Sequence, residues 1–106
     1  MLPQGHRRID LRSLAMHRAI ASKLSADPTL LAIALDNLDR WTLTAGRSRP
    51  YLDAWREILA RPIADVAALI VEDTEHMTAM RQNGPFAGVL SPQERWAIYR
   101  EFEKPL

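Results

Sequence analysis

The sequence predicts an all-α protein, built as a single-domain compact bundle of about five helices. Proline recurs where a helix can begin, after Asp27, Arg49, Arg61 and Ser91. Apolar side chains recur at helical spacing between these prolines, and no stretch alternates apolar and polar residues as a half-buried strand would. The 106 residues, of which 47% are hydrophobic and 25% charged, fit one globular domain spanning residues 1–106.

The first predicted helix covers about residues 11–25, with Asp10 as its N-cap. Residues 1–9 then form a basic N-terminal segment that can be flexible. The apolar face of the helix carries Leu14, Met16, Ile20, Ala21 and Leu24. His17 lies on this apolar side, where a partly buried histidine with satisfied hydrogen bonds is expected.

The second and third predicted helices cover about residues 28–45 and 50–60. Asp27 is the expected cap of the second helix and Gly46 its stop. Each helix carries one apolar stripe, formed by Leu30, Leu31, Ala34, Leu35, Leu38 and Trp41 in the second and by Tyr51, Leu52, Trp55, Ile58 and Leu59 in the third. Both helices are therefore expected to pack on one core.

The fourth predicted helix covers about residues 62–82 and has a wide apolar arc, so we expect it to be central. Asp73 falls inside this arc, between Leu69 and Met77. A buried carboxylate needs a partner. That partner is either an arginine or loop backbone of this chain, or a basic group on another protein.

The fifth predicted helix covers about residues 92–103 and has the clearest start in the chain. Ser91 and Glu94 have the spacing of a capping box, with proline at the first helical position between them. Trp96, Ile98, Tyr99 and Phe102 form its apolar face. The preceding residues 85–90 carry no charge, so this loop is expected to pack either on the protein's own core or on a partner.

Charge is unevenly distributed along the chain. Residues 1–25 carry five basic side chains against one acidic, a net charge of +4, whereas the whole chain is at +1. The basic side chains are Arg7, Arg8, Arg12, Arg18 and Lys23. Either they form a solvated helix face, or residues 6–23 contact the backbone of a nucleic acid.

No catalytic signature is found. The cluster formed by Glu72, Asp73, Glu75 and His76 could supply two metal ligands, which is too few for a site, so no metal is expected. No serine, threonine or lysine has the context of an activated nucleophile, and no glycine-rich phosphate loop occurs. We therefore expect no enzymatic activity and no cofactor.

The sequence also bears on cellular location. It contains no cysteine, and residues 1–8 lack the apolar region of a signal peptide. The longest apolar run, residues 66–71, is too short for a membrane span. A cytoplasmic protein without membrane contact is the resulting expectation.

Two blocks of sequence carry a resemblance to a known group. They are residues 13–24, SLAMHRAIASKL, and residues 81–96, RQNGPFAGVLSPQERW, together with Asp27-Pro28, Trp41 and Trp55. The chain resembles small helical bacterial antitoxins that are paired with nucleotidyltransferase-type toxins. The resemblance implies a helical protein that binds and occludes a toxin enzyme, and it assigns no residue to that role.

These observations favour a non-catalytic protein-binding module, the antitoxin of a bacterial toxin–antitoxin pair. The residues expected to contact the partner are Phe86, Val89, Leu90, Trp96, Tyr99 and Asp73, because apolar and aromatic anchors dominate stable interfaces. The alternative is a small DNA-associated regulator that uses the basic N-terminal segment.

Overall fold

The computed structural model describes the backbone of residues 4–103 and the side chains of residues 8–103. The predicted all-α fold is confirmed: this part of the chain forms six α-helices and contains no strand. The helices are α1 (Gln4–Ala26), α2 (Leu31–Thr42), α3 (Arg49–Leu59), α4 (Ile63–Leu69), α5 (Glu75–Arg81) and α6 (Pro92–Glu103). Two short 3-10 turns, Pro28–Leu30 and Gly46–Ser48, precede α2 and α3.

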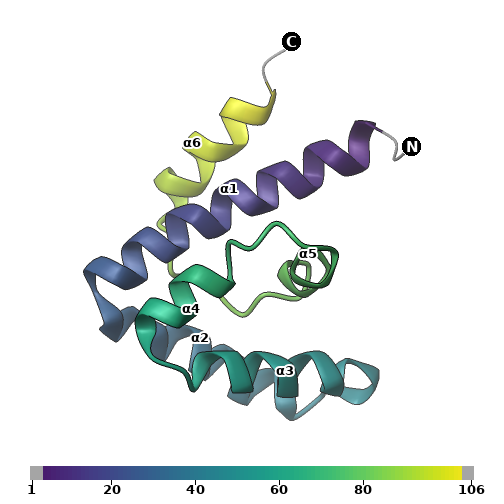
Figure 1. Ribbon diagram of the computed structural model, residues 1–106, viewed down its shortest axis with the longest axis vertical. Helices are drawn as coiled ribbons and strands as arrows, with labels where there is room; N and C mark the ends of the chain where they lie inside the picture. The colour runs from purple at the N-terminus through teal and green to yellow at the C-terminus, as the bar shows by residue number, and fades with distance from the viewer. Residues whose placement is uncertain (1–3, 104–106) are drawn as a thin grey trace.

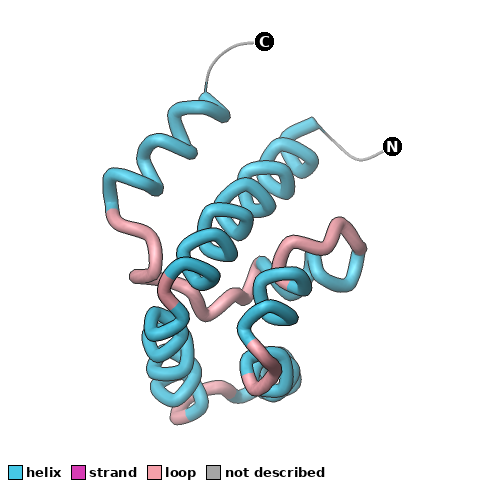
Figure 2. Tube along the Cα trace, turned by 60° about the vertical axis from the view of Figure 1, so that its left-hand side comes forward, coloured by secondary structure: helices cyan, strands magenta, loops and turns pink. Residues whose placement is uncertain are grey.

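The long helix α1 organises the molecule (Figure 1). It packs against α4, α5 and α6, whereas α2 and α3 pack against each other as an antiparallel hairpin at the opposite end from α6. The segment between α5 and α6 crosses the middle of the molecule and joins the two sides (Figure 2). The resulting radius of gyration is 14.0 Å, close to the value of about 13 Å expected for a compact domain of this size.

The core forms where these elements meet. Its fully enclosed side chains include Leu24 of α1, Leu38 of α2, Trp55 of α3, Ile70 and Met80. The indole nitrogen of Trp55 donates a hydrogen bond to the Met80 carbonyl at 3.2 Å, so this large side chain is buried with its polar group paired. Among the described residues, no helix is long and apolar enough to cross a bilayer.

The start of the first helix differs from the prediction. Helix α1 begins at Gln4, so Asp10 lies inside the helix and is not its N-cap. Residues 4–9 of the predicted N-terminal segment therefore belong to the helix, while residues 1–3 lie outside the described part of the chain, and the flexibility of the segment stays a prediction. Once a helix is nucleated each added residue gains a hydrogen bond, and glutamine and arginine are good helix formers.

The predicted central helix over residues 62–82 is the main error. The chain forms α4 and α5 instead, separated by a break at residues 70–74. Thr74 is extended and caps α5, since its hydroxyl accepts a hydrogen bond from the Met77 N–H at 3.1 Å. The Arg81 guanidinium donates to the carbonyl oxygens of Ile70 at 3.2 Å and Glu72 at 2.8 Å, which pairs acceptors freed by the break.

Most of the other predicted boundaries are close to the observed ones. Asp27 caps the turn before α2, where its side chain accepts from the Thr29 N–H at 3.2 Å. Helix α2 ends at Thr42, earlier than predicted, and α3 and α6 match within one residue. The capping box of α6 is confirmed, because the Glu94 N–H donates to the Ser91 hydroxyl at 3.1 Å and the Ser91 N–H donates to Glu94 at 2.7 Å.

The charge-free segment between α5 and α6 packs on the protein's own core. Phe86 is 4% exposed and lies edge-on to Trp55, with ring centroids 5.4 Å apart. Val89 and Leu90 are buried as well. The Asn37 side chain donates to two carbonyls of this segment, those of Pro85 at 2.8 Å and Ala87 at 2.9 Å. The segment is therefore a loop built into the core.

Candidate functional site

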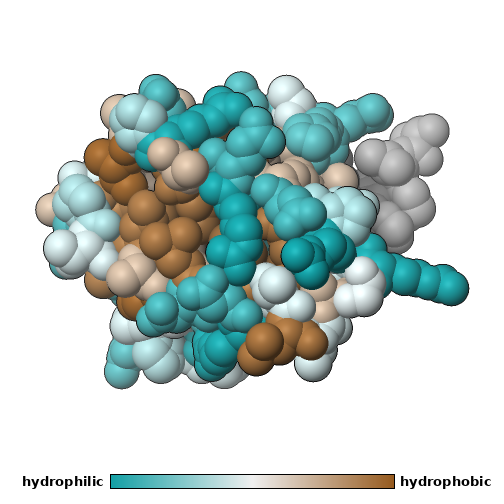
Figure 3. Space-filling view, turned by 90° about the horizontal axis from the view of Figure 1, so that it is seen from below, coloured by the Kyte–Doolittle hydropathy of each residue, from teal (hydrophilic) through white to brown (hydrophobic). Residues whose placement is uncertain are grey.

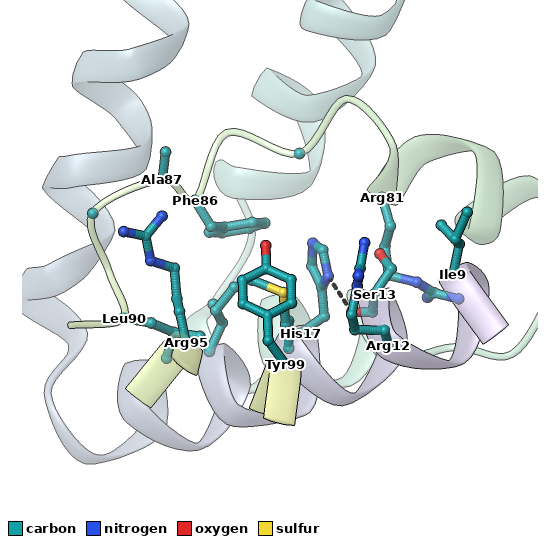
Figure 4. A pocket seen from close by; sticks show the side chains of 14 residues that line it. Ile9, Arg12, Ser13, His17, Arg81, Phe86, Ala87, Leu90, Arg95 and Tyr99 are labelled. Atoms are coloured by element: carbon teal, nitrogen blue, oxygen red, sulfur yellow. Dashed lines mark hydrogen bonds between the residues drawn. The ribbon is translucent and has the colours of Figure 1, made fainter. Parts of the chain in front are cut away.

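The candidate site is a pocket of about 270 Å³ between α1, α6 and the loop of residues 82–91. Figure 4 shows its main side chains, with His17 and Phe86 near the centre, Arg95 on one side and Arg81 on the other. The complete lining comprises Ile9, Arg12, Ser13, Met16, His17, Ile20, Arg81, Gly84, Phe86, Ala87, Gly88, Leu90, Arg95 and Tyr99. The pocket is half open, with apolar and cationic groups in its walls.

His17 stands at the back of the pocket and is 7% exposed. Its Nδ1 donates to the Ser13 carbonyl at 2.7 Å, which leaves Nε2 as the bare nitrogen of the neutral ring. Nε2 is buried and has no hydrogen-bond partner among the described residues. Burial lowers the pKa of His17, and the positive charge of Arg81 lowers it further. The expected burial is confirmed, but only one of the two ring nitrogens is satisfied.

The loop fits closely over His17. A Cβ atom at Gly84 would lie 3.0 Å from Nε2 and 3.3 Å from the Arg81 carbonyl oxygen, so only glycine fits without displacement of the loop or the ring. The ring of Phe86 meets His17 edge-on with centroids 5.7 Å apart. These contacts hold the imidazole in one orientation.

Arg81 forms the other inner wall and is only 5% exposed. Besides the two carbonyls of the α4–α5 break, it donates to the Thr78 hydroxyl at 3.3 Å, and its Nε is buried without a partner. Burial lowers the pKa of Arg81, while the nearby charges of Asp73 and Asp10 act in the opposite direction. No carboxylate forms an ion pair with Arg81 in the described part of the chain.

Helix α6 is attached to α1 by polar contacts. The Lys23 ammonium forms an ion pair with Glu94 at 2.8 Å and donates to the Val89 carbonyl at 2.9 Å. The hydrogen bonds from Lys23 and from the Ser91 N–H lower the pKa of Glu94 to about 2. The Arg12 guanidinium lies over the Tyr99 ring, 4.7 Å from its centroid.

Aromatic and apolar side chains continue outward from this contact. The rings of Tyr99 and Trp96 meet at a centroid distance of 6.3 Å, and Trp96 is 58% exposed. Ile9, on α1, is 52% exposed and lines the same pocket as Tyr99. We call the exposed surface formed by Ile9, Arg12, Arg95, Trp96 and Tyr99 the α1–α6 face.

The structure divides the residues predicted to contact a partner into two groups. Phe86, Val89 and Leu90 are core residues, so their assignment to a contact surface is corrected, because the loop is covered by this protein's own helices. Trp96 and Tyr99 lie on α6 at the surface or partly exposed, and they touch each other.

The environment predicted for Asp73 is wrong. Asp73 was expected on the apolar face of one long helix, where a carboxylate needs a partner, but it is exposed in the break between α4 and α5. An exposed carboxylate needs no buried cation, and contact of Asp73 with a partner protein stays a prediction. Asp73 lies beside Arg81 in a second depression, on the α5 side of α1.

Two of the basic residues predicted to contact nucleic acid are engaged with α6 instead. Lys23 is bound to Glu94, and Arg12 is stacked on Tyr99. Arg8 and Arg18 are exposed, whereas the side chains of His6 and Arg7 lie outside the described residues. Part of the N-terminal charge thus serves to hold α6.

The acidic cluster with His76 lies open to solvent. Glu72, Asp73, Glu75 and His76 are all exposed around the start of α5. Within residues 8–103, no three His, Asp or Glu side chains come together in a geometry that could hold a metal ion.

Arg81 and Arg95 were not predicted as members of a site. Arg81 stands at the end of α5, directly before the Asn83-Gly84 turn, and belonged to the predicted helix over residues 62–82. Its burial follows from the break at residues 70–74, for which the Thr74 cap was the only local signal.

Comparison with known proteins adds no relative: no family model, no curated protein and no solved structure matches this chain.

Proposed function

We propose that this chain is a non-catalytic protein-binding module, the antitoxin of a bacterial toxin–antitoxin pair, and that it contacts its toxin through the α1–α6 face. The resemblance of its sequence to such antitoxins motivates the choice of partner. The observation that carries the choice of surface is Trp96, a large side chain that is 58% exposed beside Tyr99 and Arg95.

The composition of this face is that of an interface centre. Tryptophan, tyrosine and arginine are the residue types that most often dominate binding energy, because each offers a large contact area together with a polar group. Tyr99 connects the parts of the face, since it touches both Arg12 and Trp96. Through Tyr99 the face joins the Arg12 guanidinium to the exposed Trp96 ring in one patch.

The face is also held by a fixed scaffold. The capping box and the ion pair of Lys23 with Glu94 fix the start of α6 against α1. A partner can therefore bind without first ordering the start of α6, which lowers the entropic cost of association.

The direct test is co-expression with the product of the adjacent gene. That product alone should arrest growth, and this chain should restore it. Trp96→Ala and Arg95→Glu should each weaken the purified complex by about 2–4 kcal/mol, measured by calorimetry. Tyr51→Ala, an exposed aromatic residue of α3 at the other end of the molecule, is the matched control and should bind normally. An adjacent product without toxicity, or equal losses in all three variants, would contradict the proposal.

The alternative function, nucleic-acid binding, would give a different result in the same preparation. Affinity for a DNA duplex would fall steeply with salt and would drop when Arg8 and Arg18 are changed to glutamine. Trp96→Ala would leave it unchanged. That outcome would replace the toxin with DNA as the partner.

A further inference from the structure

The pocket behind the α1–α6 face is lined by three cationic side chains. Arg12, Arg81 and Arg95 line it, and neither Asp nor Glu does. Like charges gathered in one concavity repel each other, and a concave surface concentrates their field. An anion placed among them would relieve this repulsion.

The guanidinium groups have hydrogen-bonding capacity left for such a ligand. Arg95 forms no side-chain hydrogen bond or ion pair within the described residues, and Arg12 contacts only the face of the Tyr99 ring. Both lie where solvent can enter. In Figure 4 the Arg95 guanidinium and the Tyr99 hydroxyl both point toward the 82–91 loop.

The inner wall carries polar groups whose hydrogen bonds are incomplete. Two side chains that are more than nine-tenths buried, those of His17 and Arg81, each keep one nitrogen without a partner among the described residues. Asp10 and Asp73 line a separate depression that Arg81 also lines, so they offset part of the Arg81 charge, whereas neither lines the pocket that holds Arg12 and Arg95.

We propose that this pocket binds one oxyanion group, a carboxylate or a phosphate, with Arg95 as its direct ligand and with Arg12 and Arg81 as further positive charges in its walls. A guanidinium group can donate two parallel hydrogen bonds to the two oxygens of either anion. The anion comes from an acidic side chain of the bound toxin or from a free small molecule. Only the toxin as the source of the anion rests on the proposed function. The affinity of the pocket for an oxyanion does not depend on whether this chain is an antitoxin.

The first experiment titrates the full chain with inorganic phosphate at constant ionic strength, maintained with chloride, and follows nitrogen–proton NMR spectra. The Arg95 Nε–H signal and the Gly88 amide should shift together and saturate. The Gly46 amide, in the turn before α3, should remain in place. Absence of a saturable shift at the pocket signals would overturn the proposal.

A pair of matched variants distinguishes phosphate binding at the pocket from attraction of phosphate by the overall positive charge of the protein. Arg95→Gln should weaken phosphate binding by about tenfold or more, as expected for loss of a charge-assisted hydrogen bond. Arg61→Gln removes the same charge from an exposed position between α3 and α4 and should bind phosphate as the unchanged chain does. Equal weakening in both would overturn the proposal. The fold of each is checked by its amide spectrum, and Arg12→Gln serves as the second pocket variant if Arg95→Gln alters that spectrum.

The effect of phosphate on the complex with the toxin then shows whether the anion comes from the toxin or from a free small molecule. If a toxin carboxylate fills the pocket, phosphate weakens the complex more than chloride of equal ionic strength. If the ligand is a free small molecule, the complex still binds phosphate with unchanged toxin affinity. Failure of the toxin to bind would contradict the proposed function alone. The phosphate titration would still test whether the pocket binds an oxyanion.

Discussion

The loop before α6 and α6 itself are both rich in apolar residues, but the loop is buried and α6 is largely exposed. Phe86, Val89 and Leu90 of the loop are buried, whereas α6 has no fully buried residue and exposes Trp96. Apolar composition alone therefore does not separate core from contact surface in this chain. A loop usually lies at the surface and a helix with aromatic residues usually packs inside, so this pair reverses the common arrangement.

Backbone hydrogen bonding explains how the loop can be buried. A helix pairs its own backbone groups, but a buried loop needs partners from elsewhere. Here Asn37 donates to two loop carbonyls and Lys23 to a third, that of Val89. Arg40 in turn donates to the Asn37 side-chain oxygen. These polar side chains permit the loop to fill the space between α1, α2 and α3.

The largest expected effect comes from removing the loop's aromatic anchor. Phe86→Ala should lower the free energy of unfolding by about 3–5 kcal/mol, because it leaves a cavity between His17 and Trp55. Trp96→Ala should change it by less than about 0.5 kcal/mol, as expected for an exposed site. Urea unfolding measures both. Similar losses would show that the two segments do not differ in burial as described.

A smaller effect is expected from the polar support of the loop. Asn37→Ala leaves the Pro85 and Ala87 carbonyls without their donor and should destabilise the protein by about 1–3 kcal/mol. Hydrogen exchange should speed up at Val89, whose N–H closes the turn on the Phe86 carbonyl. Asn83→Ala, at an exposed position, is the control. Unchanged exchange at Val89 in Asn37→Ala would contradict the supporting role.

The capping interactions at the start of α6 should contribute less to the free energy of unfolding than the Asn37 hydrogen bonds do. Ser91→Ala removes the hydroxyl that accepts from the Glu94 N–H and should cost about 1 kcal/mol. The loss should appear as faster amide exchange in the first turn of α6, with the loop unaffected. Ser22→Ala, an exposed serine within α1, should be close to neutral. A loop that opens together with the α6 terminus would show that the two segments unfold as one unit.

Lowering the pH should destabilise two contacts in separate pH ranges: the contact of the loop with His17 of α1, and the contacts that Glu94 makes at the start of α6. Burial lowers the pKa of His17 from its ordinary value of 6.5, so the unfolded chain takes up the proton first and stability falls as pH drops below 6.5. The pKa of Glu94 is lowered from 4.5 to about 2, so its contribution is present above 4.5 and is lost as pH falls toward 2.

Unfolding measured across pH tests this separation. His17→Gln should remove the upper slope and Glu94→Gln the lower one, while His76→Gln, at an exposed site of α5, should retain both. An upper slope that persists in His17→Gln would mean that another group controls it.

The underside of the molecule gives a second comparison with the α1–α6 face. Aliphatic side chains gather toward one end of this side (Figure 3). Independently of that patch, α2, α3 and the turn between them expose the larger apolar side chains of Leu35, Trp41, Leu43 and Tyr51. Among the surfaces formed by residues 8–103, the α1–α6 face alone combines exposed aromatic rings with a pocket lined by arginines, which is why the proposed contact is placed there.

The sequence by itself determined the features that depend on neighbouring residues. Helical spacing predicted the all-α fold, and the Asp27 cap and the Ser91–Glu94 capping box were predicted correctly. Each results from interactions within one helical turn, so a short stretch of sequence contains all the groups involved.

Only the tertiary structure decided what depends on distant residues. The break at residues 70–74 is stabilised by Arg81, and the buried loop by Asn37, which lies about 50 positions earlier in the chain. The pocket joins Arg12 of α1 to Arg95 of α6. Such contacts depend on how the helices pack, and no periodicity within a single helix encodes which apolar segment the others will cover.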